Sequence, residues 1–453
     1  MKSSNSFPKH VTVAAFVTLL AFSGCREAGR PNVILISIDC LNQRQFELAL
    51  EQGDAPALAA LKRDSVAFSR AYSHAPWTTP SHMSMLTGLY PSQHGRDVPY
   101  GLMIEWNDYY PRTPRFDTIG DRLSSIGYDT AAFVGQGSIS AAYGLAQGFD
   151  VFEEHRKVQG TWTDLDQILD ATETWLTERG DAPFFLFFHT YDLHGPRPKG
   201  LETDRDAIRY IDQYVARLVL TLETLGLYDS SLIIVTGDHG SNMIETDDKC
   251  CLHGAGHYEE NLKVPLLLKY PDSVDTRDET SIARHVDLLP TVMDVVGSDV
   301  DTYDGPGVSL RDEPDPSRPV TMSFSEADGR CVMRRALVTD RYKYIYTPRD
   351  ERQSLLQAND RFFDDTCKAE CRDVPIEELF DLHKDPFEKQ NLLAGRLNDE
   401  RSQWLERLRL EMARHLNLPS RYTTQLVTGP NTGIDEEAAK QLRDSLRTLG
   451  YIE

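Results

Sequence analysis

Three apolar segments of the sequence each lead into an aspartate, and two of these aspartates have a histidine close by. Asp39 follows NVILISI, Asp192 and His194 follow PFFLFFHTY, and Asp238 and His239 follow SLIIVTG. Carboxylate oxygens combined with imidazole nitrogens suit Zn²⁺ or Mn²⁺ better than the all-oxygen cage typical of Ca²⁺. A single aspartate at a strand end is usually a turn or helix cap, but three such ends together predict a metal site.

A segment rich in hydroxyl groups, APWTTPSHMSMLTGLYPSQHG at 75–95, supplies a candidate nucleophile. Its composition predicts a short helix that starts near Thr78. Pro80 suits the first turn of this helix, because an N–H group there would have no partner within the helix. Thr78 is therefore either a helix cap or a nucleophile at a helix N-terminus, where negative charge is favoured. The residues alone favour neither interpretation, and His94 is interpreted as structural.

The elements that must position these groups can be predicted from periodicity. The three apolar segments have the length and continuity of buried strands. Helical patterns lie between them, at 57–68, 171–180 and 207–226, the last of which ends at Gly226. Strands that alternate with helices predict an α/β fold, a mostly parallel sheet sandwiched by helices. In such sheets, ligands bind beyond the carboxyl ends of the strands, which is where the three aspartates are expected.

A change of composition near 297–319, rich in Asp, Gly and Pro, predicts a domain junction. We expect the larger domain at 31–300 and a smaller C-terminal α+β domain at 317–419. The smaller domain contains PVTMSFSE, ALVTD and RYKYIYTP, which alternate like antiparallel strands, and the helical SQWLERLRLEMARHL. In the tail at 420–453, GIDEEAAKQLRDSLRTLGY is typical of a short amphipathic helix.

The first 25 residues have the pattern of a secretory signal peptide. Lys2 and Lys9 precede the apolar run VTVAAFVTLLAF, which is too short to span a bilayer, and small residues lead to Cys25. This ending resembles a bacterial lipoprotein cleavage box, although Phe22 replaces its usual Leu and leaves plain secretion open. We predict an extracytoplasmic lipoprotein, in the periplasm or at the outer membrane, that meets the membrane through its lipid anchor.

Charge and cysteine content restrict the partners and the compartment. The chain has 453 residues and a formal net charge of −22, which argues against nucleic acid as a partner because nucleic acid binding requires Lys and Arg. An anion site would therefore need local compensation from a metal, Arg or backbone N–H groups. Six cysteines follow Cys25, and an oxidising compartment permits disulfides whose pairing the sequence does not give. We interpret Cys40 as a buried thiol.

The order of these motifs resembles that of the sulfatase family within the alkaline phosphatase superfamily. The resemblance covers about Pro31 to Leu393, and its landmarks are NVILISIDCL, APWTTPSHMSMLTGLYPSQHG, FFLFFHTYDLHGP, IIVTGDHG, HGAGHYEENLKVPLLL, VDLLPTVMDVVG, RYKYIY and ELFDLHKDPFEKQNLL. The family's nucleophile lies two residues before the proline of its C/S-x-P-S-R motif. By this resemblance, Thr78 is the nucleophile.

The resemblance also implies a set of ligands and substrate contacts. It assigns one divalent metal to Asp39, Thr78, Asp238 and His239. Zn²⁺ or Mn²⁺ is favoured, Ca²⁺ remains open, and one or two ions are expected. A second ion would be held by Asp192, His194 and His253, where the spacing HGxxxY favours His253 over His257. These residues could instead bind the substrate oxyanion or protonate the leaving group. His82, His189 and Lys343 could contact the substrate. For Lys343, the alternative of an exposed strand residue is preferred.

The departures from the family pattern bear on the substrate. Formylglycine sulfatases need Cys or Ser at position 78 and usually Arg at position 82, whereas this chain has Thr78 and His82. Threonine cannot become formylglycine, which excludes the aldehyde-hydrate mechanism. Cys40 replaces the second acid of the family's Asp-Asp pair, and Asn42 replaces an Arg. These changes weaken the case for a Ca²⁺ sulfatase site.

We therefore expect a metal-dependent hydrolase of sulfate, phosphate or phosphonate esters that forms a covalent Thr78 ester and favours phospho-substrates. The substrate would be a small molecule or a glycan or lipid ester. An enzymatic alternative is a phosphoryl transferase to a glycan or lipid, although membrane-embedded relatives of that kind carry transmembrane helices that are not seen in this sequence. A binding lipoprotein that has lost catalysis is the alternative of another class. The presence of Asp39, Thr78, Asp238 and His239 together argues against it.

Overall fold

The computed structural model describes residues 29–95, 116–135, 139–155, 165–194, 200–241, 256–272, 276–298, 303–311, 323–329, 332–348 and 375–416. The segments predicted to be a signal peptide and a C-terminal helix lie outside these residues, as do His253 and every cysteine except Cys40. The chain divides into two units, Met1–Arg30 and Pro31–Glu453, and every described helix and strand belongs to the second. Among the described helices, none is long and apolar enough to cross a membrane.

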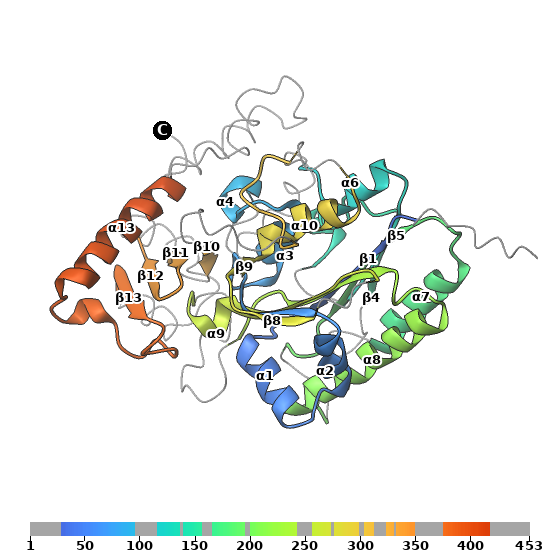
Figure 1. The fold of residues 1–453 in the computed structure, drawn as a ribbon, viewed down its shortest axis with the longest axis horizontal. Helices are drawn as coiled ribbons and strands as arrows, with labels where there is room; N and C mark the ends of the chain where they lie inside the picture. Colours follow the sequence, from blue (N-terminus) through green and yellow to red (C-terminus); the bar gives the residue numbers. More distant parts are fainter. Residues whose placement is uncertain are drawn as a thin grey trace, which may run out of the picture. The chain divides into compact units, whose positions relative to one another are not determined.

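A mixed sheet forms the centre of this second unit, and its described strands number nine (Figure 1). Their order is β4 (Val151–His155), β3 (Asp129–Gly135), β5 (Phe184–Thr190), β1 (Asn32–Ile38), β6 (Ser231–Gly237), β7 (Lys263–Lys269), β2 (Val66–Tyr72) and β8 (Arg277–Glu279), with β9 (Ala283–Arg284) also on β2. The run from β4 to β6 is parallel, and β7 is antiparallel to both of its neighbours. The predicted, mostly parallel sheet is confirmed. The three strands that lead into aspartates are the adjacent β5, β1 and β6.

Helices cover both faces of the sheet because the strands are apolar on both sides. Ile34 and Ile36 pack in one core with α1 (Gln43–Glu51), α2 (Pro56–Arg63), α7 (Leu165–Glu178) and α8 (Asp204–Thr224). Val33 and Leu35, which alternate with them, pack in the opposite core with α3 (Thr78–Thr87), α6 (Ile119–Ser125) and α10 (Leu288–Val295). Figure 1 shows these two groups of helices on either side of the sheet.

The helix predicted at 57–68 is wrong in its second half. Helix α2 ends at Arg63, and Val66 begins strand β2, which pairs with β7. Leu58 and Leu61 have helical spacing, but Val66 and Phe68 are buried because they lie in the sheet. A short apolar run cannot by itself distinguish the end of a helix from the start of a strand. The helices predicted at 171–180 and 207–226 correspond to α7 and α8, and Gly226 follows α8 at φ 68°.

The C-terminal part forms a second, antiparallel sheet, as its alternating pattern predicts. Its order is β10 (Ser323–Gly329), β11 (Val332–Val338), β12 (Tyr342–Tyr346) and β13 (Glu377–Asp381). One face packs against the predicted helix, α13 (Asp399–Leu416), through Leu337, Tyr344 and Leu408. Two short helices, α4 (Pro91–His94) and α9 (Glu259–Leu262), complete the described α-helices. The domain boundaries at 300 and 317 stay a prediction.

Lys343 corrects the expectation of an exposed strand residue, because it is completely buried. Its Nζ lies 3.2 Å from Glu259 Oε1 and 3.0 Å from Glu388 Oε1. Lys343 lies on the face of β12 that, with Ile345, is turned away from α13 and toward residues such as Tyr72 and Leu262 of the larger part. Alternation in the sequence shows that a strand has two faces, but not that both of them are covered.

The Lys343 cluster predicts a specific pH dependence of stability. Burial, together with the Glu259 carboxylate, raises the pKa of Glu388 to about 7, although the Lys343 ammonium opposes the shift. A carboxyl group whose pKa is higher in the folded chain stabilises the fold at acid pH, and this stabilisation is lost as the pH rises through about 7. We expect the melting temperature of the wild type, relative to Glu388→Gln, to fall between pH 5 and pH 8.5. Parallel pH profiles of the two proteins by calorimetry would contradict this expectation.

Candidate active site

The candidate site lies at the carboxyl ends of β1, β5 and β6. Asp39 follows β1 directly, and Asp238 and His239 follow β6. Because Ile38 pairs with Thr190 on one side and with Gly237 on the other, the three strands end at the same edge of the sheet. One ligand atom from each of Asp39, Asp238 and His239 lies within 4.8 Å of the others. All three side chains are completely buried.

Thr78 is the first residue of α3, and its hydroxyl is turned toward these groups. The N-cap of the helix is Trp77, which makes no side-chain cap bond. Thr78 is therefore not the N-cap residue, contrary to the alternative interpretation. The Thr78 hydroxyl donates to Asp39 Oδ2 at 3.2 Å, and its oxygen lies 3.4 Å from His239 Nε2. A nucleophile at this position has the positive end of the helix dipole beside it. The arrangement fits the nucleophile interpretation of Thr78.

The pKa values of the two buried carboxyl groups, Asp39 and Asp238, are shifted in opposite directions. Burial alone would raise the pKa of Asp39, but the imidazoles of His189, His239 and His194 hold it well below its usual range. Burial and the Asp39 charge raise the pKa of Asp238 to about 7. Asp39 Oδ1 and Asp238 Oδ2 are buried without a hydrogen-bond partner among the described residues. Two such oxygens, with an imidazole and a hydroxyl beside them, fit the requirements of a divalent cation.

His82 is completely buried beneath Thr78 and is held at both ring nitrogens. Nδ1 lies 2.8 Å from the Thr78 carbonyl oxygen and Nε2 lies 2.9 Å from Ser37 Oγ. Since a carbonyl oxygen can only accept, Nδ1 carries the proton and Nε2 accepts from the Ser37 hydroxyl. Burial, together with the His189 charge, lowers the pKa of His82 to about 3, so the ring is neutral. These contacts fit a residue that holds the first turn of α3 in place.

We expect His82→Ala to lower kcat about 10–100-fold with little change in KM, as is usual when a group that orients the reacting residues is removed. The physical reason is that the Thr78 carbonyl loses its donor, which loosens the start of α3. His82→Asn, whose amide can reach the same carbonyl, should recover part of the rate. Steady-state kinetics at constant metal content measure this effect. A raised KM with an unchanged kcat would instead support the substrate contact predicted from the sequence.

Of the other residues predicted for the site, His189 and His194 belong to candidate ligand groups, whereas Asp192 does not. His189 is buried, with its Nε2 3.6 Å from Asp39 Oδ2, and it forms a second ligand group with His82 and Asp238. His194 forms a third group with Asp39 and Cys40. Asp192 is buried, but no ligand group found among the described residues includes it.

Two residues of this site were not predicted from the sequence. Ser37 orients His82, and its serine in an apolar strand gave no specific signal. Cys40 is buried, as the sequence predicts, but its membership of a ligand group was not expected. The signal for Cys40 was present, because it replaces the second acid of the family's pair. His257, by contrast, lies outside all three ligand groups; burial and the charges of Arg334, Lys343 and Arg335 lower its pKa.

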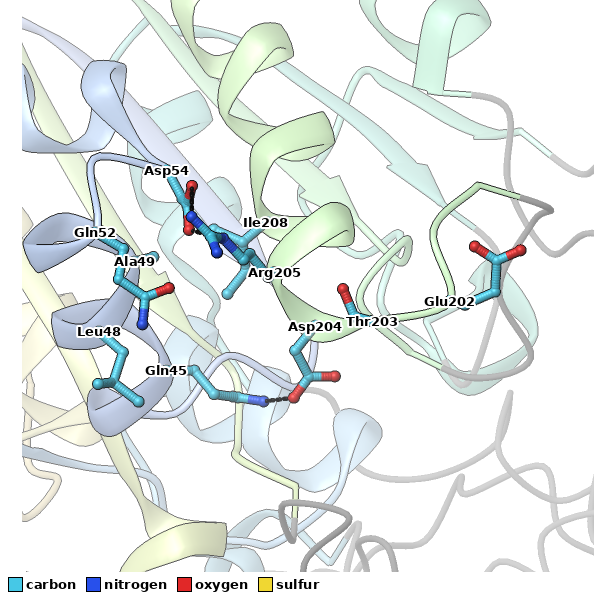
Figure 2. A pocket seen from close by; sticks show the side chains of 10 residues that line it. All are labelled: Gln45, Leu48, Ala49, Gln52, Asp54, Glu202, Thr203, Asp204, Arg205 and Ile208. Atoms are coloured by element: carbon cyan, nitrogen blue, oxygen red, sulfur yellow. Dashed lines mark hydrogen bonds and ion pairs between the residues drawn. The ribbon is translucent and has the colours of Figure 1, made fainter.

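A cavity of about 340 Å³ lies between α1 and the N-terminal end of α8, and it shares no lining residue with the strand-end site. Figure 2 shows Gln45 pointing to Asp204 across this cavity, and Asp54, which follows the end of α1, in contact with Arg205. Leu48, Ala49 and Ile208 are among the apolar lining residues. The cavity is therefore separate from the cluster around Asp39.

Comparison with known proteins identifies relatives over most of the chain. A family model described as "Sulfatase" matches residues 31–298. Human "Arylsulfatase A" is 26% identical, with 83% of this chain and 86% of that protein covered. "Endo-4-O-sulfatase" of Bacteroides thetaiotaomicron is 22% identical, with 62% of this chain and 73% of that protein covered.

Two solved structures show the same fold at low sequence identity. One was determined in complex with its substrate, D-glucosamine-2-N,6-O-disulfate; it has a TM-score of 0.63, 16% identity and coverage of 86% of this chain and 99% of that chain. The other is the phosphonate monoester hydrolase of Agrobacterium radiobacter, with a TM-score of 0.63, 20% identity and coverage of 85% and 96%. At these identities the likeness concerns the fold.

Proposed function

The chain belongs to the sulfatase family of ester hydrolases, and on that premise we propose that Thr78 is its nucleophile and that it prefers phosphate or phosphonate esters. The observation that carries this proposal is the place of the Thr78 hydroxyl. It lies at the first residue of a helix, 3.2 Å from Asp39 Oδ2 and 3.4 Å from His239 Nε2. A hydroxyl in this setting is close to groups that can hold a metal and faces the end of the helix that stabilises anions.

The residues that would hold a divalent cation are Asp39, Thr78, Asp238 and His239. Such a cation would lower the pKa of the Thr78 hydroxyl and would offset the charge of the transferred group. Zn²⁺ and Mn²⁺ suit this mixture of oxygen and nitrogen donors. The buried Asp39 and Asp238 oxygens without hydrogen-bond partners among the described residues support the assignment.

In the proposed reaction, Thr78 Oγ attacks phosphorus in line with the ester oxygen. The Oγ–P bond forms as the bond from phosphorus to the alcohol oxygen breaks, and the alcohol leaves with a proton. Water then cleaves the Thr78 ester, which releases the phosphoryl product and restores the hydroxyl. His194 and His253 are the residues that the sequence assigns to protonation of the leaving group or to contact with the oxyanion. His82 holds the first turn of α3, so that Oγ keeps its direction.

The preference for phospho-substrates rests on the identity of residue 78. Threonine cannot be converted to formylglycine, so the route that uses an aldehyde hydrate is closed on chemical grounds. The phosphonate monoester hydrolase has a similar fold, which is consistent with such chemistry on this scaffold. The sugar substrate of the other solved structure supports the proposal that the natural ester is carried by a glycan. We also keep the proposal of an extracytoplasmic lipoprotein, which rests on residues 1–25.

A substrate panel tests the preference. The purified protein is stripped of metal, reloaded separately with Zn²⁺, Mn²⁺ or Ca²⁺, and assayed on p-nitrophenyl sulfate, p-nitrophenyl phosphate, a phosphodiester and a phosphonate monoester. We expect a phospho-ester to give the highest kcat/KM with Zn²⁺ or Mn²⁺. A highest value for the sulfate ester would contradict the substrate preference but not the family. Metal binding without turnover of any ester would indicate a more demanding natural substrate, whereas the absence of both metal binding and turnover would favour the binding lipoprotein.

A further inference from the structure

We propose that Cys40 is the thiolate ligand of a second metal site, which it forms with His194 and with Asp39, the residue that it shares with the first site. The starting observation is a cluster of three different donors. One atom each from the Asp39 carboxylate, the Cys40 thiol and the His194 imidazole lies within 4.8 Å of the other two. The proposal rests on the proposed function, because the first site is the one assigned to the Thr78 reaction.

The shared residue, Asp39, has a buried oxygen that no described group satisfies, the same oxygen that supports the first site. Asp39 is completely buried, and its Oδ1 has no hydrogen-bond partner among the described residues. Its other oxygen, Oδ2, accepts from Thr78. Oδ1 lies 4.0 Å from His239 Nε2 of the first site, and Asp39 also belongs to the group of Cys40 and His194, so this one carboxylate is available to both sites. Buried polar atoms are otherwise almost always hydrogen-bonded, so the state of Oδ1 requires an explanation.

Cys40 is held firmly at this position. Its side chain is buried, with 2% exposed. Its backbone has φ 64°, a left-handed conformation that is uncommon for a residue other than glycine, and its N–H donates to Asp238 Oδ1 at 3.0 Å. The amide of Cys40 therefore contacts a ligand of the first site, while its thiol belongs to the second group. His194 lies on the loop after β5, stacked on Tyr191 with ring centroids 4.3 Å apart.

The donor set determines which metals fit. One thiolate, one imidazole and one carboxylate leave a coordination position open for water or substrate, as in catalytic zinc sites. Soft thiolate ligands favour Zn²⁺ and Co²⁺ over Ca²⁺ and Mg²⁺. The site differs from the set predicted from the sequence, since Cys40 and Asp39 take the places of Asp192 and His253. It also makes His194 a metal ligand, so that His253 becomes the remaining imidazole assigned to the leaving group.

Cobalt spectroscopy tests the thiolate directly, without reference to turnover. The full chain is stripped of metal and titrated with Co²⁺, and the absorption of the wild type is compared with that of Cys40→Ser. We expect a near-ultraviolet thiolate-to-cobalt band in the wild type that is lost in the variant, and a bound zinc content that falls from about two ions to about one per chain. The difference between the two proteins isolates Cys40 from the other cysteines. An unchanged band and an unchanged zinc content would overturn the proposal.

Three further variants keep this experiment decisive. His194→Ala should also lose one zinc ion, and it replaces Cys40→Ser if that variant does not fold. Cys40→Asp restores the acid pair of the family; it should bind two ions without the band and shift the preference toward Mn²⁺ or Ca²⁺. Thr78→Ala removes the proposed nucleophile but none of the three donors, so the band should remain. Loss of the band in Thr78→Ala would overturn the assignment, whereas persistence of turnover there would contradict only the proposed function.

Discussion

Thr78→Ala should lower kcat by at least about 10⁴-fold on every ester that the wild type hydrolyses, as is typical when a covalent nucleophile is removed. The Thr78 hydroxyl donates to Asp39 Oδ2 at the start of α3 and is the proposed nucleophile. Without it, attack would depend on water that is not held in line by the start of α3. The Michaelis constant should change little, because the methyl group and the backbone of residue 78 remain.

Thr78→Ser is the matched control for this prediction, because it keeps the hydroxyl and removes one methyl group. We expect it to retain measurable turnover, within about 10–100-fold of the wild type, because the loss is one of orientation and not of chemistry. Rapid quenching of the wild type with a slow substrate should also trap a phosphoryl group on the peptide that contains residue 78. Turnover by Thr78→Ala at a rate near that of the wild type would indicate direct attack by water and remove Thr78 from the mechanism.

The part of this site that lies at strand ends could be predicted from the sequence for a geometric reason. Parallel strands that are neighbours in a sheet end at one edge, so residues far apart in the chain meet there once the strands are recognised. Asp39 and Asp238 are far apart in the sequence, yet their strands β1 and β6 are directly paired. Three apolar segments and their last residues were enough for this prediction, because the long-range geometry followed from the fold class.

Other features depended on contacts that periodicity does not encode. The apolar residues up to Phe68 continue the helical spacing of α2 in the sequence. They nevertheless form strand β2, because this segment pairs with β7. Lys343 is buried because a second sheet covers it, and the carboxylates that neutralise it come from residues 259 and 388. The ring of His82 is directed inward by Ser37 and the Thr78 carbonyl. In each case the deciding partner is distant in sequence or belongs to the backbone, so local pattern and composition carry no record of it.

Asp39→Asn should abolish binding of both metal ions, because Asp39 belongs to the ligand groups of both sites. We expect kcat to fall by about 10³-fold or more, on the scale of losing a preorganised charge at the reacting centre. The amide also disrupts the contacts of Thr78 and His189, which face Asp39 Oδ2. Zinc content measured by elemental analysis, together with the cobalt band, reports the effect independently of activity.

Asp238→Asn is the matched comparison, since Asp238 takes part in the first site and not in the group of Cys40 and His194. It should lose one ion and most activity but keep the thiolate-to-cobalt band. Its metal-free form should be more stable than the metal-free wild type at pH 8, because the substitution removes a buried carboxylate beside the Asp39 charge. If the fold becomes more stable when the Asp238 carboxylate is removed, that carboxylate is present for function and not for stability. Loss of both ions in Asp238→Asn would show that the two sites are not separable, and equal melting temperatures without metal would show that the carboxylate pair carries no such cost.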